Sequence, residues 1–428
     1  SIKAKVIGLV VASMVLLASI TVMEVAFLSE TAFLDKSYSS LKNARDIKKD
    51  RIESFFKTIT NDVDVLSKSE NTRNIVSDLI FVHSRLKVKS DMKYPVKDPF
   101  AKQKMDLHEE FFGDYVKKYG YYDLFIVGAK HGHVMYTQAK ESDFGENLSV
   151  GVLKDSGLAK VWRKTLENDR VTFVDMEPYL PSNNVPAMFV GAPIKIYDEV
   201  NAVLVLQIND KLISDAMLFR QGYGESQEDY LVGHDNLMRS DSYLSPKTHS
   251  VKSSFANPEK GKLTSTTISK ALDGKTGVET VVDYRGENVL SAYSTIKVGE
   301  DFNWAIISEI DEAEVLVEPN NFRNIVLLTA AALLIVFVLL TTFIINIILI
   351  KPLNKIRADL NTFEANKDLN SRLQEGRDEL GAMSTSINKF IISMQTIIKE
   401  AKDSSMENSS IATELSQTSL QIGKKAEN

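Results

Sequence analysis

One uninterrupted apolar stretch constrains this chain more than any other feature. Residues 325–350, IVLLTAAALLIVFVLLTTFIINIILI, carry no charged side chain, and Lys351-Pro352-Leu353 follows directly. A helix needs about 20 residues to cross the roughly 30 Å hydrocarbon core of a bilayer, so this stretch can span it with some tilt. A buried helix of a soluble protein is the alternative, but such helices are usually shorter. The stretch therefore predicts a transmembrane helix.

A second apolar stretch runs from Val6 to Leu28 and is broken only by Glu24. Basic residues precede this stretch and follow the later one, whereas acidic residues flank both on the other side, at positions 24, 30, 35, 309, 311, 312, 314 and 318. The positive-inside rule then places both termini in the cytoplasm and residues 29–324 outside. A cleaved signal peptide would begin similarly, but the stretch is long and shows no A-x-A site.

The composition excludes several classes of function. A net charge of −6 with no concentrated basic patch gives no reason to expect nucleic acid as a partner. The chain has no cysteine, so a disulfide framework, a thiolate metal site and a cysteine nucleophile are impossible. At 428 residues it is long enough for two or three domains.

The region between the two apolar stretches shows two alternating patterns in succession. Apolar residues at helical spacing, without proline, predict one long amphipathic helix over residues 35–79. After a short helix near residues 107–115, a strand pattern with one crossing helix at 156–166 predicts strands at 122–127, 134–138, 171–179, 187–193 and 202–208. A shorter copy follows, with helices at 210–217 and 268–272 and strands at 229–232, 237–240, 277–284, 289–296 and 303–309. We therefore predict two PAS-like antiparallel α/β modules on one long helix, a distal module over about 35–209 and a proximal module over about 210–318.

Residues after the second apolar stretch show two helical seams. Leucine, isoleucine and phenylalanine recur at steps of three and four from Leu353 to Phe363, and a second seam begins at Leu380 and continues past Ala401. Such seams predict a two-helix unit that forms a parallel bundle in a dimer. Two surface helices with ordinary amphipathic faces are the alternative. Beyond residue 403 the seam includes Ser404, Asn408 and Thr418, which predicts a weakly packed, adjustable coiled coil.

Catalytic motifs do not stand out. We find no glycine-rich phosphate loop, no GxSxG and no HExxH. His131 and His133 are spaced to share one face of a strand, as a metal pair would, but a turn and a strand surface explain them as well. Three nearby acids, Asp123, Glu141 and Asp143, are interpreted as solvated or structural. We therefore predict a protein that is not an enzyme, with no cofactor and no metal site.

Several stretches resemble the double Cache sensor domains of bacterial chemoreceptors. They are GYYDLFIV, KESDFGENL, EPYLPSNNVPAMFVGAPI, GESQEDYLVGHDNLMRSDS and DYRGENVLSAY, and they cover most of residues 110–295. The Pro352-Leu353 entry and the Asp378-Glu379-x-Gly381 start of the second helix are similar to a HAMP relay. One departure is Gln227, where relatives commonly carry glycine. The resemblance implies a distal module that binds a small ligand and a proximal module that relays the signal.

Resemblance and alternation together suggest nine ligand-binding residues in the distal module: Tyr136, Lys140, Phe144, Asn147, Tyr179, Ser182, Asn184, Phe189 and Gln207. Amino-acid-binding relatives hold the ligand's ammonium group with a tyrosine, an aspartate two residues later and an aspartate on a later strand. Here Tyr179 matches the tyrosine, but Pro181 and Gln207 stand in place of the acids. That pattern argues against an α-amino acid, and Lys140 with the amides suits a carboxylate instead.

The resulting expectation is an α+β membrane protein with two Cache modules, two transmembrane helices, a HAMP pair and the start of a cytoplasmic coiled coil. The expected boundaries are 1–28, 29–324, 325–350, 351–403 and 404–428. It would be a methyl-accepting chemotaxis receptor of the bacterial inner membrane, with its sensor region periplasmic or extracellular. We predict signal-relay roles for Pro352, Glu379 and Gly381, and methylation at Glu414.

The resemblance also implies partners. They are a small-molecule ligand, a second copy of the chain in a homodimer, a higher-order receptor array, and a chemotaxis adaptor and histidine kinase that bind a tip beyond residue 428. Two other classes stay open. A sensor histidine kinase would place a histidine soon after the HAMP pair, and no histidine follows His249, whereas a nucleotide cyclase domain could begin after residue 428. A secreted binding protein would leave the two seams unexplained.

Overall fold

The computed structural model describes residues 2–426, which fall into two compact units. One unit is residues 27–322, and the other combines the residues up to Ala26 with those from Arg323 onward. Residue 1, in the predicted first span, and residues 427 and 428, in the predicted signalling helix, lie outside the described residues.

The long helix predicted over residues 35–79 is two helices. Helix α1 (Ile2–Ser67) ends before Lys68, and α2 (Glu70–Arg85) begins after Ser69. Ser69 adopts an extended conformation (φ −68°, ψ 153°), and its Oγ accepts a hydrogen bond from the Thr72 N–H at 3.2 Å. This N-cap competes with continuation of the helix, so a single local side chain ends α1 where apolar periodicity alone predicts no break.

Replacement of Ser69 by alanine should lower the free energy of unfolding by about 1 kcal/mol, because the first turn of α2 loses its cap. The matched control is Ser77→Ala, where an exposed mid-helix serine only bonds the Arg73 carbonyl of its own helix. Urea titration of both variants measures the difference. Equal effects of the two substitutions would show that Ser69 is not an effective cap.

The distal module contains a five-stranded antiparallel sheet. Its strands are β1 (Asp123–Gly128), β2 (Val134–Thr137), β3 (Thr172–Tyr179), β4 (Val185–Ile196) and β5 (Glu199–Ile208), in the order β2-β1-β5-β4-β3. Helix α5 (Gly157–Asn168) crosses one face, while α1, α2, α3 (Pro99–Asp106) and α4 (Glu109–Tyr119) supply the core on the other. Both faces are buried, so successive residues point into different cores: Leu124 and Ile126 toward α1, Phe125 and Val127 toward α5.

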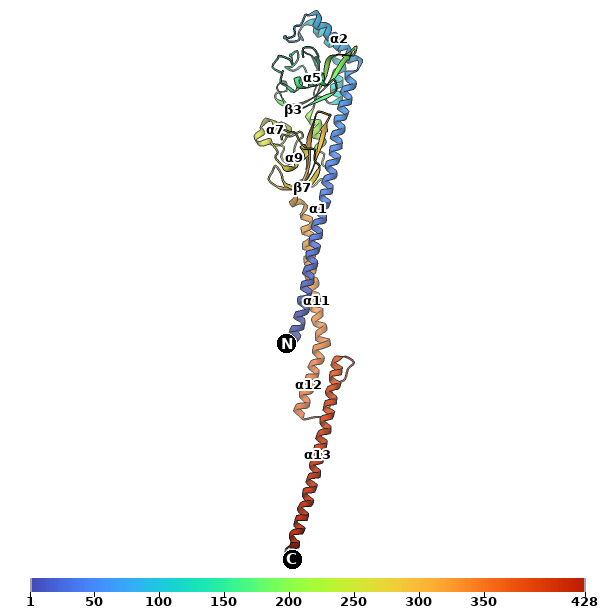
Figure 1. Cartoon of the computed structure of the whole chain (residues 1–428), viewed down its shortest axis with the longest axis vertical. Helices are drawn as coiled ribbons and strands as arrows, with labels where there is room; N and C mark the ends of the chain where they lie inside the picture. Colours follow the sequence, from blue (N-terminus) through green and yellow to red (C-terminus); the bar gives the residue numbers. More distant parts are fainter. Residues whose placement is uncertain (1, 427–428) are drawn as a thin grey trace. The chain divides into compact units, whose positions relative to one another are not determined.

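The proximal module contains a four-stranded antiparallel sheet beside the same helix (Figure 1). Its strands are β6 (Glu228–Val232), β7 (Gly277–Val282), β8 (Asn288–Val298) and β9 (Phe302–Asp311), in the order β6-β9-β8-β7. The helices are α6 (Asp210–Met217), α7 (Val251–Ala256), α8 (Pro258–Gly261), α9 (Thr266–Leu272) and α10 (Glu312–Val315). The predicted antiparallel α/β architecture is therefore confirmed for both modules.

The predicted strand at residues 237–240 does not form. Only an isolated bridge joins Met238 to Val232. Arg239 N–H bonds the Leu231 carbonyl at 2.7 Å, but the Leu231 N–H bonds the side-chain Oγ of Ser240 at 3.0 Å instead of a backbone carbonyl. The Ser240 hydroxyl thus replaces the backbone carbonyl that would accept the next hydrogen bond between the strands, and the pairing ends there.

A buried arginine joins the two modules. Arg239, in the proximal module, is 2% exposed, and its Nε and Nη2 each lie 2.8 Å from an oxygen of Asp175 on β3. Trp304 of β9 donates its Nε1–H to the same carboxylate at 3.0 Å. A second bridge joins Arg170 and Asp301 at 3.0 Å. Arg239 also pairs with Asp235 of its own module at 3.0 Å, so the bonds to Asp175 add a polar connection between the modules.

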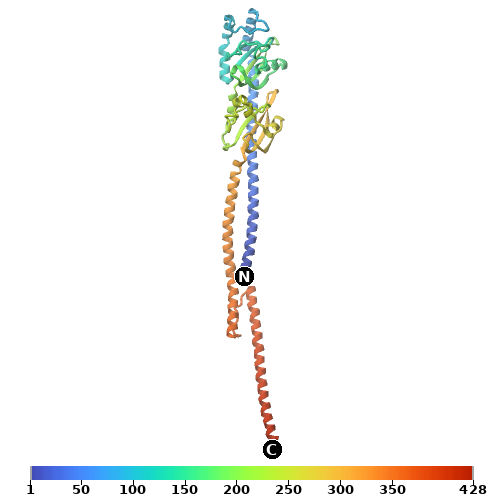
Figure 2. The same cartoon turned by 90° about the vertical axis from the view of Figure 1, so that its left-hand side faces the viewer.

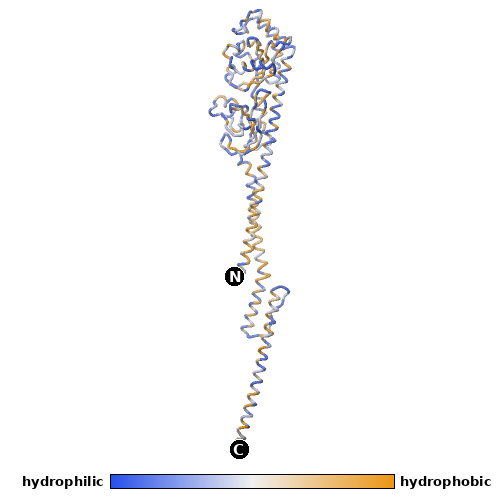
Figure 3. Tube along the Cα trace, in the orientation of Figure 1, coloured by the Kyte–Doolittle hydropathy of each residue, from blue (hydrophilic) through white to orange (hydrophobic). Residues whose placement is uncertain are grey.

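The second unit is helical. Its elements are α11 (Val317–Ile345), a π-helical turn η2 (Asn346–Ile350), α12 (Lys351–Asn366) and α13 (Glu379–Ala426). Two helical stretches, Ala4–Ser67 and Glu312–Asn366, are long and apolar enough to cross a membrane, with windows of mean hydropathy 2.6 and 3.1 that are not buried. Figure 3 shows these apolar residues at the start of α1 and along α11.

The connector between α12 and α13 folds back along α12, so both helices run in the same direction (Figure 2). The side-chain amide of Asn388 holds it by bonding both the N–H and the carbonyl of Leu373, at 2.8 and 3.0 Å. Asp378 caps α13 by accepting the Gly381 N–H at 2.8 Å. A Cβ at Gly381 would lie 2.2 Å from the Gly376 carbonyl oxygen, so this close approach requires glycine.

Candidate functional site

A group of buried polar side chains lies at one end of the distal sheet, on the face toward α5. Asp123 opens β1 and pairs across the sheet with Gln207 of β5. Tyr179 ends β3, and Phe189 lies on β4. The loop after β2 adds two further acids, Glu141 and Asp143, which bond Ser182 and Tyr179. Five chain segments therefore contribute to one site.

Asp123 is fully buried and holds the loop after β2 in place. Its Oδ1 accepts the backbone N–H groups of Gln138 and Ala139 at 2.9 and 2.8 Å, and Thr137 donates its hydroxyl to Oδ2. Burial raises the pKa of Asp123 to about 6, although these hydrogen bonds act in the opposite direction. The carboxylate is structural, but it also adds negative potential to the site.

Asp143 carries an oxygen with no partner. The Tyr179 hydroxyl donates to Asp143 Oδ2 at 2.8 Å, whereas Oδ1 is buried and makes no hydrogen bond. Burial raises the pKa of Asp143 to about 7, against the opposing effect of the Tyr179 hydrogen bond and with smaller contributions in the same direction from the carboxylates of Asp123 and Glu141. Burial and Asp143 also raise the pKa of Tyr179, so its hydroxyl stays a donor. Asp143 is thus an acceptor held in place with one free oxygen.

Gln207 supplies a second unpaired acceptor. Its Nε2 donates to Ser182 Oγ at 3.3 Å, and Ser182 in turn donates to Glu141 at 3.0 Å. The other Glu141 oxygen accepts the Tyr122 hydroxyl at 2.7 Å. The Oε1 atom of Gln207 is buried and unpaired. A buried acceptor without a donor costs about 1–3 kcal/mol, so two at one site indicate missing donors.

No cation in the part of the chain that the structure describes forms an ion pair with these carboxylates. The nearby lysines have other partners: Lys140 bonds Glu109, Lys160 bonds Glu177 and Lys93 bonds Glu146. Within residues 2–426, no lysine, arginine or histidine forms an ion pair with Asp123, Glu141 or Asp143. Three carboxylates therefore converge on a site that holds no positive charge.

Aromatic rings line the same site. Phe189 lies edge-on to Tyr179 and to Phe125, with ring centroids 5.0 and 6.2 Å away. Gly157, the first residue of α5, faces the ring, and a Cβ there would lie 3.0 Å from Phe189. The walls are therefore apolar and the acceptors few, as in small-molecule sites.

The structure brings four of the nine predicted ligand residues together: Tyr179, Ser182, Phe189 and Gln207. The other five lie elsewhere. Tyr136 is on the opposite face against Phe112, at 5.6 Å, and Phe144 packs on that same core. Lys140 is exposed and bonds both Glu109 oxygens at 2.6 Å. Asn147 bonds the carbonyls of Ser90 and Met92, and Asn184 is an exposed turn residue with φ 58°.

Three residues of the site were missed as ligand candidates: Asp123, Glu141 and Asp143. Acids are usually solvated, but of the two interpretations, solvated or structural, burial leaves only the structural one for Asp123 and Asp143. One signal was available for Asp123. It stands at the start of the apolar run 124–127, in register with Phe125 and Val127 on the buried face.

The histidine pair lies outside this site. His133 is buried with Nε2 2.8 Å from the Met92 carbonyl, and its ring lies 5.3 Å from His83. Among the residues that the structure describes, no group of three His, Asp or Glu side chains is placed to hold a metal ion.

No protein-family description and no curated protein sequence matches this chain. Solved structures of sensor domains are similar in fold. The ligand-binding domain of Pseudomonas fluorescens chemoreceptor CtaA with L-serine is 11% identical, with a TM-score of 0.41, covering 65% of this chain and 99% of its own. The ligand-binding domain of Campylobacter jejuni chemoreceptor Tlp3 with L-valine is 9% identical, with a TM-score of 0.42, covering 67% of this chain and 98% of its own. The extracellular domain of the putative histidine kinase vpHK1S-Z8 is 12% identical, with a TM-score of 0.40, covering 67% of this chain and 94% of its own.

Proposed function

We propose that this chain is a membrane-anchored sensor whose distal module binds a small molecule through a protonated amine. The observation that carries the proposal is the pair of buried, unpaired acceptors, Asp143 Oδ1 and Gln207 Oε1, beside three carboxylates without a cation.

An ammonium group fits this site for two physical reasons. It has three N–H donors, which can satisfy the unpaired oxygens of Asp143 and Gln207 together. It also carries the positive charge that the buried carboxylates lack, and buried charges are normally paired. Tyr179 cannot replace it, because its single O–H already bonds Asp143.

A carboxylate without an amine is a poorer ligand for this site. It would add a negative charge next to Asp123, Glu141 and Asp143, and the carboxylate hypothesis relied on Lys140, which bonds Glu109 instead. The argument against α-amino acids relied on Pro181 and Gln207 in place of two aspartates. Asp143, on the loop after β2, accepts the Tyr179 hydroxyl and so provides a carboxylate beside that tyrosine. An α-amino acid could therefore still bind through its ammonium group, and amino acids are candidates among the amines.

The proposed sensor transmits its signal through helices. Helix α1 contributes to the cores of both modules, and β9 leads through α10 into α11. We propose that the apolar stretches 6–28 and 325–350 span the membrane. Residues 351–403 would form a HAMP relay, in which Pro352 starts α12 and Glu379 and Gly381 start α13. The glycine-dependent contact of Gly381 with Gly376 supports a fixed connector geometry.

Exposed apolar residues in the helix that follows the relay support a homodimer. Ile411, Leu415 and Ile422 repeat along α13 and are 51–71% exposed in the single chain, as a seam that awaits a second copy would be. Glu414 is exposed on the same helix, so it is accessible to the proposed methylation. The adaptor, the kinase and a larger receptor array remain part of this proposal.

The proposal is tested by thermal midpoints of the full chain in detergent with primary amines, amino acids, organic acids and neutral analogues. A ligand at 100 times its dissociation constant should stabilise the chain by about 2.7 kcal/mol. We expect shifts only from compounds that carry an amine. Shifts from organic acids alone would overturn the assignment.

The affinity for an amine should rise with pH. The carboxyl of Asp143 has a pKa of about 7 in the empty site, so below pH 7 the ligand must displace a proton, whereas above it the carboxylate is already ionised. Since one proton is involved, binding at pH 5.5 should be about 30-fold weaker than at pH 8.5. Titration calorimetry with an amine that stays protonated throughout measures this, and equal or tighter binding at pH 5.5 would contradict it.

A further inference from the structure

The proximal sheet carries a buried polar row on one face. Glu309 of β9 pairs with Glu228 of β6 on one side and with Ser291 of β8 on the other. Directly opposed residues on neighbouring strands have their Cβ atoms about 5 Å apart on the same face, so these three side chains are neighbours. All three are buried, at 2%, 1% and 0% exposure for Glu309, Glu228 and Ser291.

Two atoms in this row have no hydrogen-bond partner. Tyr230 donates its hydroxyl to Glu309 Oε2 at 2.8 Å, but Glu309 Oε1 and Ser291 Oγ are both unpaired. Burial raises the pKa of Glu309 to about 7, against the opposing effect of hydrogen bonds from the Tyr230 and Ser291 hydroxyls and with smaller contributions in the same direction from Asp283 and Glu228. The row therefore contains a carboxyl oxygen and a hydroxyl that lie near each other on adjacent strands and have no other hydrogen-bond partner.

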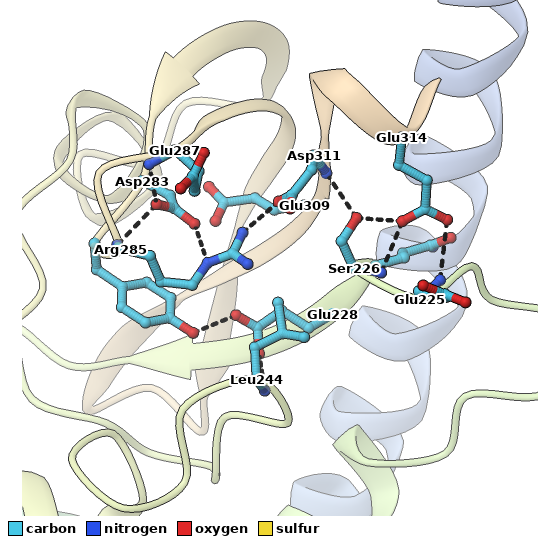
Figure 4. Close-up of polar contacts among 12 residues, drawn as sticks. Glu225, Ser226, Glu228, Leu244, Asp283, Arg285, Glu287, Glu309, Asp311 and Glu314 are labelled. Carbon is cyan, nitrogen blue, oxygen red and sulfur yellow. Dashed lines mark hydrogen bonds and ion pairs between the residues drawn. The ribbon is translucent and has the colours of Figure 1, made fainter. Parts of the chain in front are cut away.

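The charged neighbours cannot fill this position. Glu228 already accepts bonds from the hydroxyls of Tyr284 and Ser242, at 2.5 and 2.8 Å. Arg285 points its guanidinium at Asp283 and Asp311, as Figure 4 shows, with Nε 2.6 Å from Asp283. The guanidinium of Arg285 is therefore occupied.

The same arrangement occurs in the distal module. There Asp123 is the first residue of the first strand, binds backbone N–H groups of the segment after the second strand, and faces Gln207 on the last strand. Glu228 likewise opens the first strand, accepts the Tyr243 N–H at 3.0 Å, and faces Glu309 on the last strand. In both modules the last-strand residue has an unpaired oxygen. This recurrence favours a binding position over an isolated defect of packing.

We propose that the proximal module contains a second binding site, which takes a compact primary ammonium group on Glu309 Oε1 and Ser291 Oγ. The rings of Tyr230 and Tyr284, perpendicular at 89° with centroids 5.8 Å apart, flank the acidic row and provide aromatic surfaces that attract cations. The site is separate from the distal one, so it stands or falls independently of the proposed function.

The test uses the full chain carrying Asp143→Asn, so that distal binding does not contribute, and methylammonium chloride as the probe. For so small an ion we expect a dissociation constant on the order of millimolar, measured by saturation-transfer NMR titration. Adding Glu309→Gln should weaken binding by about tenfold or more, because a hydrogen bond to a charged group is lost. Ser291→Ala should weaken it by about threefold.

Three controls make the result decisive. Glu287→Gln, an exposed acid on the neighbouring turn, should leave binding unchanged. Glu309→Gln keeps the shape of the side chain, and its thermal midpoint shows whether it is folded; if it does not fold, Ser291→Ala carries the test. Undiminished binding in Glu309→Gln or Ser291→Ala would overturn the site. Equal displacement of the probe by potassium chloride at matched ionic strength would overturn its assignment to amines.

Discussion

The Asp143→Asn variant should lose amine binding and, in the absence of ligand, should be more stable than the wild type at pH 8. Binding should weaken by at least about 100-fold, because removing one partner of a buried ion pair leaves the ligand's charge uncompensated. Titration calorimetry on the full chain measures the loss. Asp114→Asn, an exposed acid on α4, is the matched control and should bind like the wild type.

The gain in stability follows from the raised pKa of Asp143. The folded chain keeps its proton up to about pH 7, whereas the unfolded chain releases it near pH 4, so folding is progressively disfavoured as the pH rises between these values. Asparagine has no proton to lose. The thermal midpoint of Asp143→Asn should therefore exceed that of the wild type by a few degrees at pH 8 and match it near pH 4. A lower midpoint at pH 8 would show that the carboxylate is already compensated.

Replacement of Arg239 by methionine should have the largest effect on stability. Arg239 is 2% exposed and connects the proximal module to Asp175 of the distal sheet. Breaking a buried ion pair typically costs about 3–5 kcal/mol. Because Asp175 is 28% exposed and keeps the Trp304 N–H, we expect about 3 kcal/mol.

Urea unfolding of Arg239→Met should also separate into two transitions, because the polar contacts between the modules are weakened. The matched control is Arg73→Met, an exposed arginine on α2, with an expected change within about 0.5 kcal/mol. A loss below about 1 kcal/mol for Arg239→Met, with a single transition, would show that the modules are joined mainly by apolar packing.

Much of the fold could be predicted from apolar alternation, because most strands are buried on at least one face. The failures have local causes. The helix breaks after Ser67 because Ser69 caps the next helix. The predicted strand at 237–240 does not form because the Ser240 hydroxyl bonds the Leu231 N–H. Hydrophobic period does not detect a single side chain that captures a backbone N–H.

The candidate site was only partly predictable. Tyr136 lies on the face opposite the site, and β1 and β2 change register next to it, where Val127 pairs with Val134; such a bulge interrupts the alternation from which a face is predicted. The sequence leaves open whether Asp123 and Asp143 are solvated or structural. Their burial depends on donors from distant segments, such as Tyr179 and Thr137, which no local pattern reveals. The dimer and the HAMP relay depend on a second chain and stay predictions.

The most direct test of the central claim is a calorimetric titration of the full chain at pH 7 with a primary amine selected by the thermal screen. The titration is repeated in two buffers of different ionisation enthalpy and with the neutral counterpart that lacks the amine. Binding of the amine alone, with release of about half a proton from Asp143, is the predicted result. Equal binding of the neutral counterpart, without proton release, would contradict the claim that buried carboxylates recognise a cation.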